Sequence, residues 1–249
     1  VVNTAQRLQV AAAPGTVLVG PATFAATRAA ISYEPRGLLQ AKGRDEPVEA
    51  WVATGTVLPP GHRRRSQGPL VGRDDEVTLL SSAVATAVHR SRAQLVLVYG
   101  EAGVGKSRIA EEVGVEARGC HGALVLEGRC VPYGEANVWW PVAEAIRQGC
   151  NIPDDADPED AEARCRAAVA GTLDHDPDDA ETVRVATGLM HLMGYDTPLR
   201  GIDPQRAREE ATRAVLSFVE GAARTRPVVI LLSDLHWADE AVLGLIGPL

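Results

Sequence analysis

The chain has 249 residues, enough for one large domain or two smaller ones. It contains no apolar run near the roughly 18 residues that span a bilayer and no charged-then-apolar leader, so we expect a cytoplasmic protein without a membrane partner. The net charge of −8 is concentrated in residues 151–182, and the only basic cluster is Arg63–Arg65. We therefore expect no direct nucleic-acid contact within this chain.

Four cysteines, none in a C-x-x-C pair, predict reduced thiols and no zinc site. The sequence starts at Val1, inside a predicted helix, and stops at Leu249 soon after a predicted strand and its turn. We therefore expect a fragment of a longer protein. Composition divides it into an incomplete first domain (1–53), a linker rich in Gly, Pro and charge (54–68) and a second domain (69–249).

The first domain is predicted to be α+β. Its expected elements are helices over 1–12 and 22–30, and strands over 16–19, 31–35, 37–41 and 48–53, with a turn at 42–47.

Residues 2–8, 14–19 and 39–48 together resemble the C-terminal third of a class III adenylate/guanylate cyclase domain. In that family an Asn and an Arg four residues later contact the nucleotide ribose and phosphates, and the resemblance implies this catalytic role for Asn3 and Arg7. Spacing of i,i+4 does put the pair on one helix face, although alone it also suits a solvated helix.

The resemblance also implies that this cyclase-like site is incomplete. The family's metal-binding aspartates and base-reading residues would precede Val1. A class III site normally forms between two such domains, so the resemblance implies a homodimer or a second cyclase domain as partner.

The second domain begins with a predicted helix whose apolar stripe includes Val77 and Val88 and for which Asp74 is a candidate cap. Next come an apolar run at 94–99, predicted to be a buried strand, and a helix to about Arg118. Further along, we expect strands at 122–127 and 228–233, helices starting at 142 and covering 207–224, and helix and loop in the acidic stretch. Alternating strands and helices predict an α/β fold, a parallel sheet with helices on both faces.

A glycine-rich loop joins the run at 94–99 to its helix and fits G-x-x-x-x-G-K-[ST], the phosphate-binding P-loop. Backbone amides and the helix N-terminus would bind phosphate oxygens, Lys106 would contact the β- and γ-phosphates, and the Ser107 hydroxyl would bind Mg²⁺. Only two of the chain's residues are lysine, Lys42 and Lys106. The predicted nucleotide-binding residues of the loop are Gly100, Glu101, Ala102, Gly103, Val104, Gly105, Lys106 and Ser107.

The second candidate metal ligand is Asp234, which ends the apolar run 228–233. A central parallel strand is buried on both faces and is therefore apolar without alternation. A carboxylate at its C-terminal end would lie beside the P-loop and hold Mg²⁺ or its waters. We therefore expect ATP and Mg²⁺ as cofactors.

Residues 70–76, 100–107, 128–135 and 234–239 together resemble the ATPase module of bacterial multidomain signalling proteins, the AAA-like, STAND-type P-loop NTPases. Such modules lie downstream of cyclase domains or upstream of LuxR-type DNA-binding domains. The resemblance implies that Val71, Gly72 and Arg73 lie near the adenine and ribose.

One residue departs from that family's pattern. Two adjacent acids usually end the second motif, but here Ser233 precedes Asp234. A hydroxyl cannot act as a carboxylate base on water, so we expect nucleotide binding with slow or absent hydrolysis. Three functions remain open: an ATP-dependent regulatory switch, a nucleotide cyclase in the parent protein, and a transcription regulator with a DNA-binding tail.

Two aromatic segments allow two interpretations each. Trp139 and Trp140 suit packing or an interface, with base stacking as the alternative. After Asp234, Trp237 suits a packed turn with Asp239 capping the next helix, and the alternative is a sensing position near the γ-phosphate.

Overall fold

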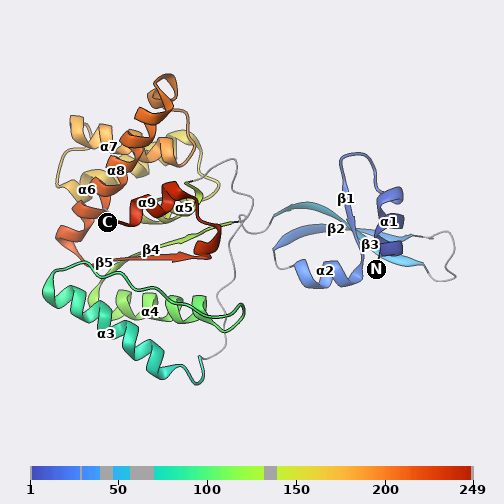
Figure 1. The fold of residues 1–249 in the computed structure, drawn as a ribbon. Helices are drawn as coiled ribbons and strands as arrows, with labels where there is room; N and C mark the ends of the chain where they lie inside the picture. The colour runs from blue at the N-terminus through green and yellow to red at the C-terminus, as the bar shows by residue number, and fades with distance from the viewer. Residues whose placement is uncertain (1, 29, 40–46, 57–69, 132–138, 248–249) are drawn as a thin grey trace. The chain divides into compact units, whose positions relative to one another are not determined.

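The computed structural model describes residues 2–28, 30–39, 47–56, 70–131 and 139–247. The chain divides into two compact units, Val1–Arg65 and Ser66–Leu249 (Figure 1). Residues 42–46 of the expected turn, residues 57–68 of the linker and residues 132–138 of the aromatic loop lie outside the described residues.

In the residues described, the first unit is an antiparallel three-stranded sheet with two helices. Strand β3 lies between β1 and β2, and Phe24 stacks on Trp51 with ring centroids 4.2 Å apart. The two strands expected at 31–35 and 37–41 are one strand, with a register shift between Pro35 and Gly37. Gly37 has φ +86, a value that favours glycine at a bulge. The elements are α1 (Val2–Ala11), β1 (Val17–Val19), α2 (Pro21–Thr27), β2 (Ile31–Leu39) and β3 (Val48–Thr56).

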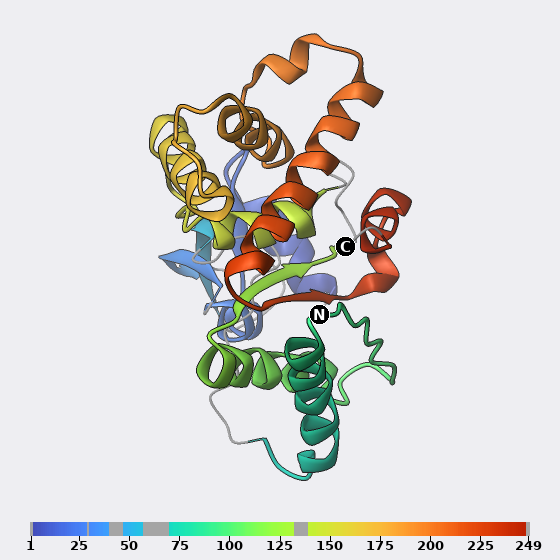
Figure 2. The same cartoon turned by 90° about the vertical axis from the view of Figure 1, so that its left-hand side faces the viewer.

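The second unit has three layers, and the middle layer is a parallel pair of strands. Strand β4 (Leu124–Arg129) pairs with β5 (Val228–Ser233) in parallel register. Helices α3 (Asp74–Arg90) and α4 (Lys106–His121) lie on one side of the pair, and α5 to α9 lie on the other (Figures 1 and 2). The expected parallel sheet with helices on both faces is confirmed for these strands.

Glycine allows α4 to approach the sheet closely. A Cβ on Gly114 would lie 3.0 Å from Leu231 Cδ1 and 3.3 Å from Val125 Cγ1. After α4 the chain turns at Gly122, which has φ +61 in the left-handed region. Strand β4 then runs back along the helix. The N-terminus of α4 therefore lies on the same side as the C-terminal ends of the strands.

The opposite layer holds most of the core. The acidic stretch is helix and loop, as expected, and each of the two helices that start in it has at its N-cap an aspartate that accepts a bond from a backbone amide of the same helix. The helices are α5 (Trp140–Gly149), α6 (Pro158–Leu173), α7 (Ala180–Leu192), α8 (Pro204–Thr225) and α9 (Glu240–Ile246), with short 3-10 turns η2 (Pro198–Gly201) and η3 (Leu235–Trp237). Their fully buried side chains include Phe218, Leu189, Val185 and Val169.

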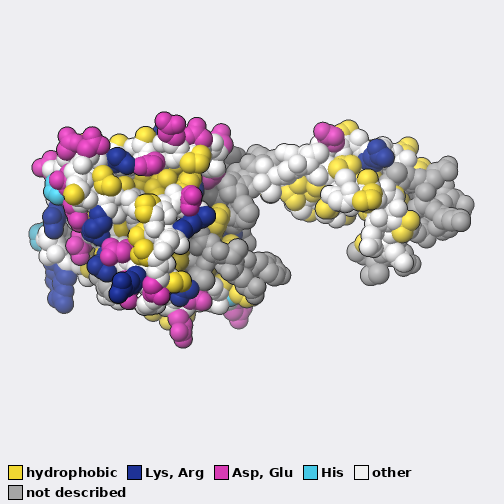
Figure 3. Space-filling view, turned by 90° about the horizontal axis from the view of Figure 1, so that it is seen from above, with side chains coloured by type: hydrophobic (Ala, Val, Ile, Leu, Met, Phe, Trp, Pro, Cys, Tyr) yellow, Lys and Arg dark blue, Asp and Glu magenta, His cyan; other side chains and the backbone are white. Residues whose placement is uncertain are grey.

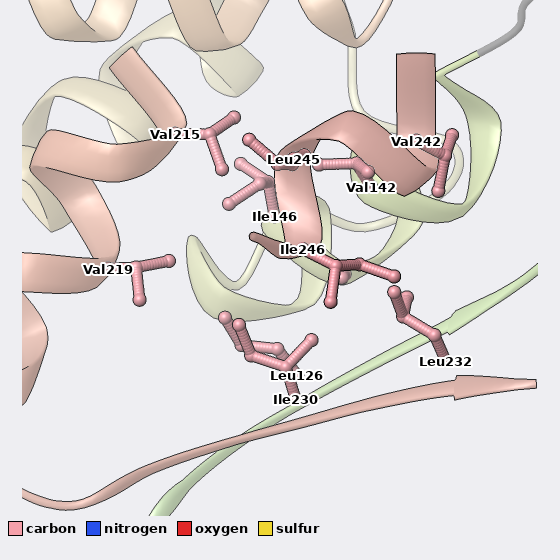
Figure 4. Close-up of a pocket in the computed structure, with 11 residues that line it drawn as sticks. Leu126, Val142, Ile146, Val215, Val219, Ile230, Leu232, Val242, Leu245 and Ile246 are labelled. Carbon is pink, nitrogen blue, oxygen red and sulfur yellow. The ribbon is translucent and has the colours of Figure 1, made fainter. Parts of the chain in front are cut away.

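An apolar cavity of about 20 Å³ remains between the strands and this layer. Side chains from β4, β5, α5, α8 and α9 point into it (Figure 4). A cavity that small and that apolar offers no hydrogen-bond partners to a water molecule, so it is packing space within the core.

The prediction of a buried strand at residues 94–99 is wrong. Residues 92–100 have no regular secondary structure, and the side chains of Leu95 and Tyr99 are 69% and 84% exposed. Apolar sequence alone does not make a strand, because the backbone N–H and C=O groups need a hydrogen-bonded neighbour. Asp74 is also not a cap; it is the first residue of α3, and the cap position is Arg73.

Acidic and basic side chains are interspersed on the face of the second unit seen in Figure 3. Several pair along one helix, as Arg164 does with Asp160 at 2.7 Å and Arg184 with Glu181 at 2.6 Å. Such pairs suit a solvated helical surface. No helix in the described parts of the chain is both long enough and apolar enough to cross a membrane.

Candidate functional site

The P-loop occupies the turn that leads into α4. Gly103 and Gly105 have φ +83 and +96, a region in which side chains with a Cβ are strained. Gly105 is the cap residue, and α4 begins at Lys106 with no acidic residue in its first turn. The open amides and the positive end of the helix dipole therefore favour an anion at this point.

Lys106 folds back over the loop that precedes it. Its Nζ donates to the carbonyl oxygens of Gly100 and Glu101, each at 2.8 Å. Both acceptors are neutral, and residues 100–104 are exposed. An ammonium group held by carbonyls keeps its full charge for a ligand, so this arrangement suits an incoming phosphate.

Arg73 joins the start of the unit to the same loop. One guanidinium nitrogen donates to the Val104 carbonyl at 3.1 Å, and the other contacts Glu76 Oε1 at 2.6 Å. The hydrogen bond from Arg73 holds the pKa of the Glu76 carboxyl below its usual value. The structure thus brings Arg73 to the P-loop, while neighbouring Val71 is 81% exposed.

A second group of candidate site residues lies at the C-terminal ends of the two parallel strands. Arg129, the last residue of β4, is in register with Ser233, the last residue of β5. Asp234 comes next, and its Oδ2 accepts from Arg129 Nε at 2.7 Å and lies 2.6 Å from Nη2. The N-terminus of α4 lies at the same end of the sheet as the C-terminal ends of β4 and β5 (Figure 1).

A close approach of α5 fixes the end of β4. A Cβ on Gly128 would lie 2.0 Å from the Pro141 carbonyl oxygen, so only glycine fits there without movement of the backbone. One turn later, Glu144 Oε2 accepts from the Arg129 amide at 3.0 Å. The backbone beneath Arg129 is therefore anchored on both sides, because the Cys130 amide also donates to the Ser233 carbonyl at 3.0 Å.

The charge of Asp234 affects the pKa of the neighbouring Cys130 thiol. Burial raises the pKa of the Cys130 thiol, and the negative charge of Asp234 raises it further. Cys130 is only 2% exposed. This thiol is consequently inert and packs beneath the site.

Asp234 and Ser107 are candidates to hold a Mg²⁺ that arrives with a nucleotide, because both side chains offer oxygen atoms. Across the described ranges no three His, Cys, Asp or Glu side chains gather into an all-protein metal site. Mg²⁺ does not need one, because it usually keeps several waters and binds through one or two carboxylates plus phosphates. Ser107 lies in the first turn of α4, where its hydroxyl can complete that set.

The remaining predicted residues lie elsewhere. Asn3 and Arg7 belong to α1 of the first unit, and their side chains are outside the described part. Trp139 packs against the core, as the packing interpretation expects. Asp239 accepts from the Ala241 amide at 2.9 Å, so its expected role as a cap is confirmed, although Trp237 is 52% exposed rather than packed.

Arg129 is the side chain beside Asp234 that sequence reasoning missed. It follows the second predicted strand, 122–127, and that position is the signal that could have found it. Parallel strands end at the same edge of a sheet, so residues that follow both predicted strands are candidates for one site.

Comparison with known proteins gives a family and one long relative. Residues 69–249 match the model of the AAA ATPase domain. An uncharacterized protein of Rhizobium meliloti (strain 1021) is 28% identical over 250 residues, which cover 98% of this chain and 23% of that protein. The chain thus spans less than a quarter of the relative's length. No solved structure matches.

Proposed function

Because the chain belongs to the AAA ATPase domain family, we propose that its second unit binds ATP with Mg²⁺ and serves as the nucleotide-dependent switch of a multidomain signalling protein. AAA ATPase domains generally use ATP and Mg²⁺. Nucleotide occupancy would act by shifting the unit between conformations that differ in their affinity for the nucleotide.

The observation that carries the proposal is the geometry of residues 100–107. Two glycines in the left-handed region turn the loop into the N-terminus of α4, and Lys106 lies over it on two carbonyl oxygens. Open amides, a helix dipole and a cation converge there, and this combination favours phosphate over other ligands.

The proposal includes slow or absent hydrolysis. Attack on the γ-phosphate needs a group that orients or deprotonates water. Ser233 contributes a hydroxyl at the end of β5, and the next residue, Asp234, is held in an ion pair with Arg129. Neither side chain in this arrangement is a carboxylate free to accept a proton from water.

The binding claim is tested by equilibrium titration of the chain with a fluorescent ATP analogue. Lys106→Ala should weaken binding by about 10- to 100-fold, as expected for ~1.5–3 kcal/mol from hydrogen bonds to a charged group. Lys42→Ala, at the chain's only other lysine, is the matched control and should leave affinity unchanged. Equal affinity of Lys106→Ala and the unmodified chain would refute the P-loop assignment.

The hydrolysis claim needs a separate measurement of phosphate release under saturating Mg-ATP. We expect turnover well below the ~1–10³ s⁻¹ of typical enzymes. The Ser233→Asp variant should release phosphate faster than the unmodified chain. Brisk turnover that disappears in Asp234→Ala but not in Ser233→Ala would show that the single aspartate suffices.

The link to cyclic nucleotide synthesis is also a proposal. It is supported by the class III cyclase-like patterns around Asn3 and Arg7 in the first unit. The alignment with the Rhizobium protein covers both units, so the same order of segments occurs in a much longer relative. A complete cyclase site would require a homodimer or a second cyclase domain.

Cyclic nucleotide formation by the complete gene product tests that link. Asn3→Ala and Arg7→Ala should each lower it without changing ATP-analogue binding by the second unit. If the complete protein makes no cyclic nucleotide, the cyclase link fails while the switch remains. Specific retention of duplex DNA would instead favour the transcription-regulator alternative.

A further inference from the structure

The ion pair between Arg129 and Asp234 joins two residues that are 105 positions apart in the sequence. They meet because β4 and β5 are parallel and end in register. Their side chains are 25% and 31% exposed. The pair therefore lies at the surface of the strand edge, within reach of solvent, over a backbone that Gly128 and Glu144 hold in place.

Asp234 behaves differently from the other aspartates at N-cap positions described in this unit. Each of the other four uses its carboxylate to accept a backbone amide of its own helix: Asp157, Asp179, Asp203 and Asp239. Asp234 precedes η3 without such a bond and has φ +56, in the left-handed region. Its backbone is strained, and its carboxylate contacts Arg129 instead.

We propose that the Arg129 guanidinium occupies the metal-binding carboxylate of the nucleotide-free protein, so that Arg129 and Mg²⁺ compete for Asp234. This inference rests on the proposed binding of Mg-ATP. Both cations seek the same oxygens, and Ser233 offers no second carboxylate that could hold one of them. Binding of the metal with its nucleotide must therefore release Arg129, which moves a charged side chain at the end of β4.

A partly exposed ion pair of this kind is weak, and both guanidinium nitrogens here contact the same oxygen, Asp234 Oδ2. The competition is consequently weak enough for Mg-ATP to overcome and strong enough to measure. Its signature is the Mg²⁺ concentration needed for tight nucleotide binding, which rises with the strength of the Arg129–Asp234 contact.

The experiment titrates Mg²⁺ into the full 249-residue chain at a fixed concentration of fluorescent ATP analogue. In Arg129→Gln the half-saturating Mg²⁺ concentration should fall about three- to tenfold, whereas affinity in EDTA should stay the same. The matched control is Arg118→Gln, which breaks the 2.6 Å pair with Glu127 on the same strand β4 and should leave the Mg²⁺ requirement unchanged.

An unchanged or raised Mg²⁺ requirement in Arg129→Gln would overturn the proposal, because it would mean that Arg129 does not compete with the metal or even helps Asp234 to bind it. Failure of the proposed function looks different: no analogue would bind with or without Mg²⁺, in any variant. Arg129→Lys keeps the charge but loses the planar fork, so it should give a smaller decrease.

A measurement on the unmodified chain covers the case in which Arg129→Gln does not fold. The ¹⁵N–¹H signal of the Arg129 Nε group, assigned by its loss in Arg129→Lys, reports the hydrogen bond to Asp234 directly. Mg-ATP should shift this signal and speed its exchange with water, while ATP in EDTA should not. A signal that Mg-ATP leaves unchanged would likewise refute the competition.

Discussion

Arg73 and Val104 lie 31 residues apart and are joined by a 3.1 Å hydrogen bond from the guanidinium to the carbonyl oxygen. The bond links the start of α3 to the middle of the P-loop. A residue outside the loop is therefore expected to affect phosphate binding, because a loop that is already held in one conformation loses less entropy when a ligand arrives.

We predict that Arg73→Ala weakens ATP-analogue binding about fivefold, corresponding to ~1 kcal/mol for one exposed hydrogen bond. Glu76→Gln separates this effect from the ion pair, because it removes the negative charge from the 2.6 Å contact and keeps the bond to Val104. Fluorescence titration should therefore show a loss in Arg73→Ala and little change in Glu76→Gln. Equal losses would assign the effect to the ion pair.

The close packing of α7 on α8 leads to a prediction about stability. A Cβ on Gly188 would lie 2.5 Å from Ala214 Cβ and 3.2 Å from the Glu210 carbonyl oxygen. Gly188→Ala should thus lower the free energy of unfolding by about 1–3 kcal/mol. Gly171→Ala, in α6 with nothing within 4 Å, is the control and should raise it by up to ~1 kcal/mol. Urea denaturation followed by circular dichroism measures both.

His191 on α7 makes stability depend on pH. Burial lowers its pKa from the usual 6.5, and the positive charge of Arg200 lowers it further. The unfolded chain therefore binds the proton first, so stability is full above pH ~6.5 and falls as pH drops towards the folded pKa. His191→Gln should reduce this loss in thermal unfolding scans, whereas His89→Gln, on the exposed end of α3, should not. An identical pH profile for His191→Gln would contradict the assignment.

The exposed run at 94–99 predicts fast amide exchange. Residues 92–100 have no regular structure, while the amides of β4 are paired with β5. In hydrogen-exchange mass spectrometry, peptides covering 95–99 should exchange within seconds and peptides covering 124–129 far more slowly. Slow exchange at 95–99 would mean that this segment pairs with another strand in solution.

Local sequence signals predicted the elements that depend on local chemistry. The P-loop glycines, the helix that starts at Lys106 and the cap at Asp239 follow from conformational preferences of single residues or short spacings. The strand β5 also followed from its unbroken apolar run. In each case the residues that decide the structure are neighbours in the chain.

Features that depend on distant partners were not predictable in the same way. Residues 94–99 have the composition of a buried strand, but strand formation depends on which neighbour is beside them. The Arg129–Asp234 pair requires knowledge that β4 and β5 are adjacent and in register. The acidic stretch was expected to hold helix and loop, but the two helix starts, capped by Asp157 and Asp179, were not predicted.

The parallel pairing of β4 with β5 also shapes how the second unit folds. The strands that meet at Leu124 and Val228 are separated by the whole layer α5 to α8. During synthesis β4 leaves the ribosome before α5 to α8 and β5, so it cannot pair with β5 until those residues have been synthesised. Folding of this unit is therefore expected to be slow, with its rate set by closure of a long loop, and the helical layer has time to form before β4 and β5 pair.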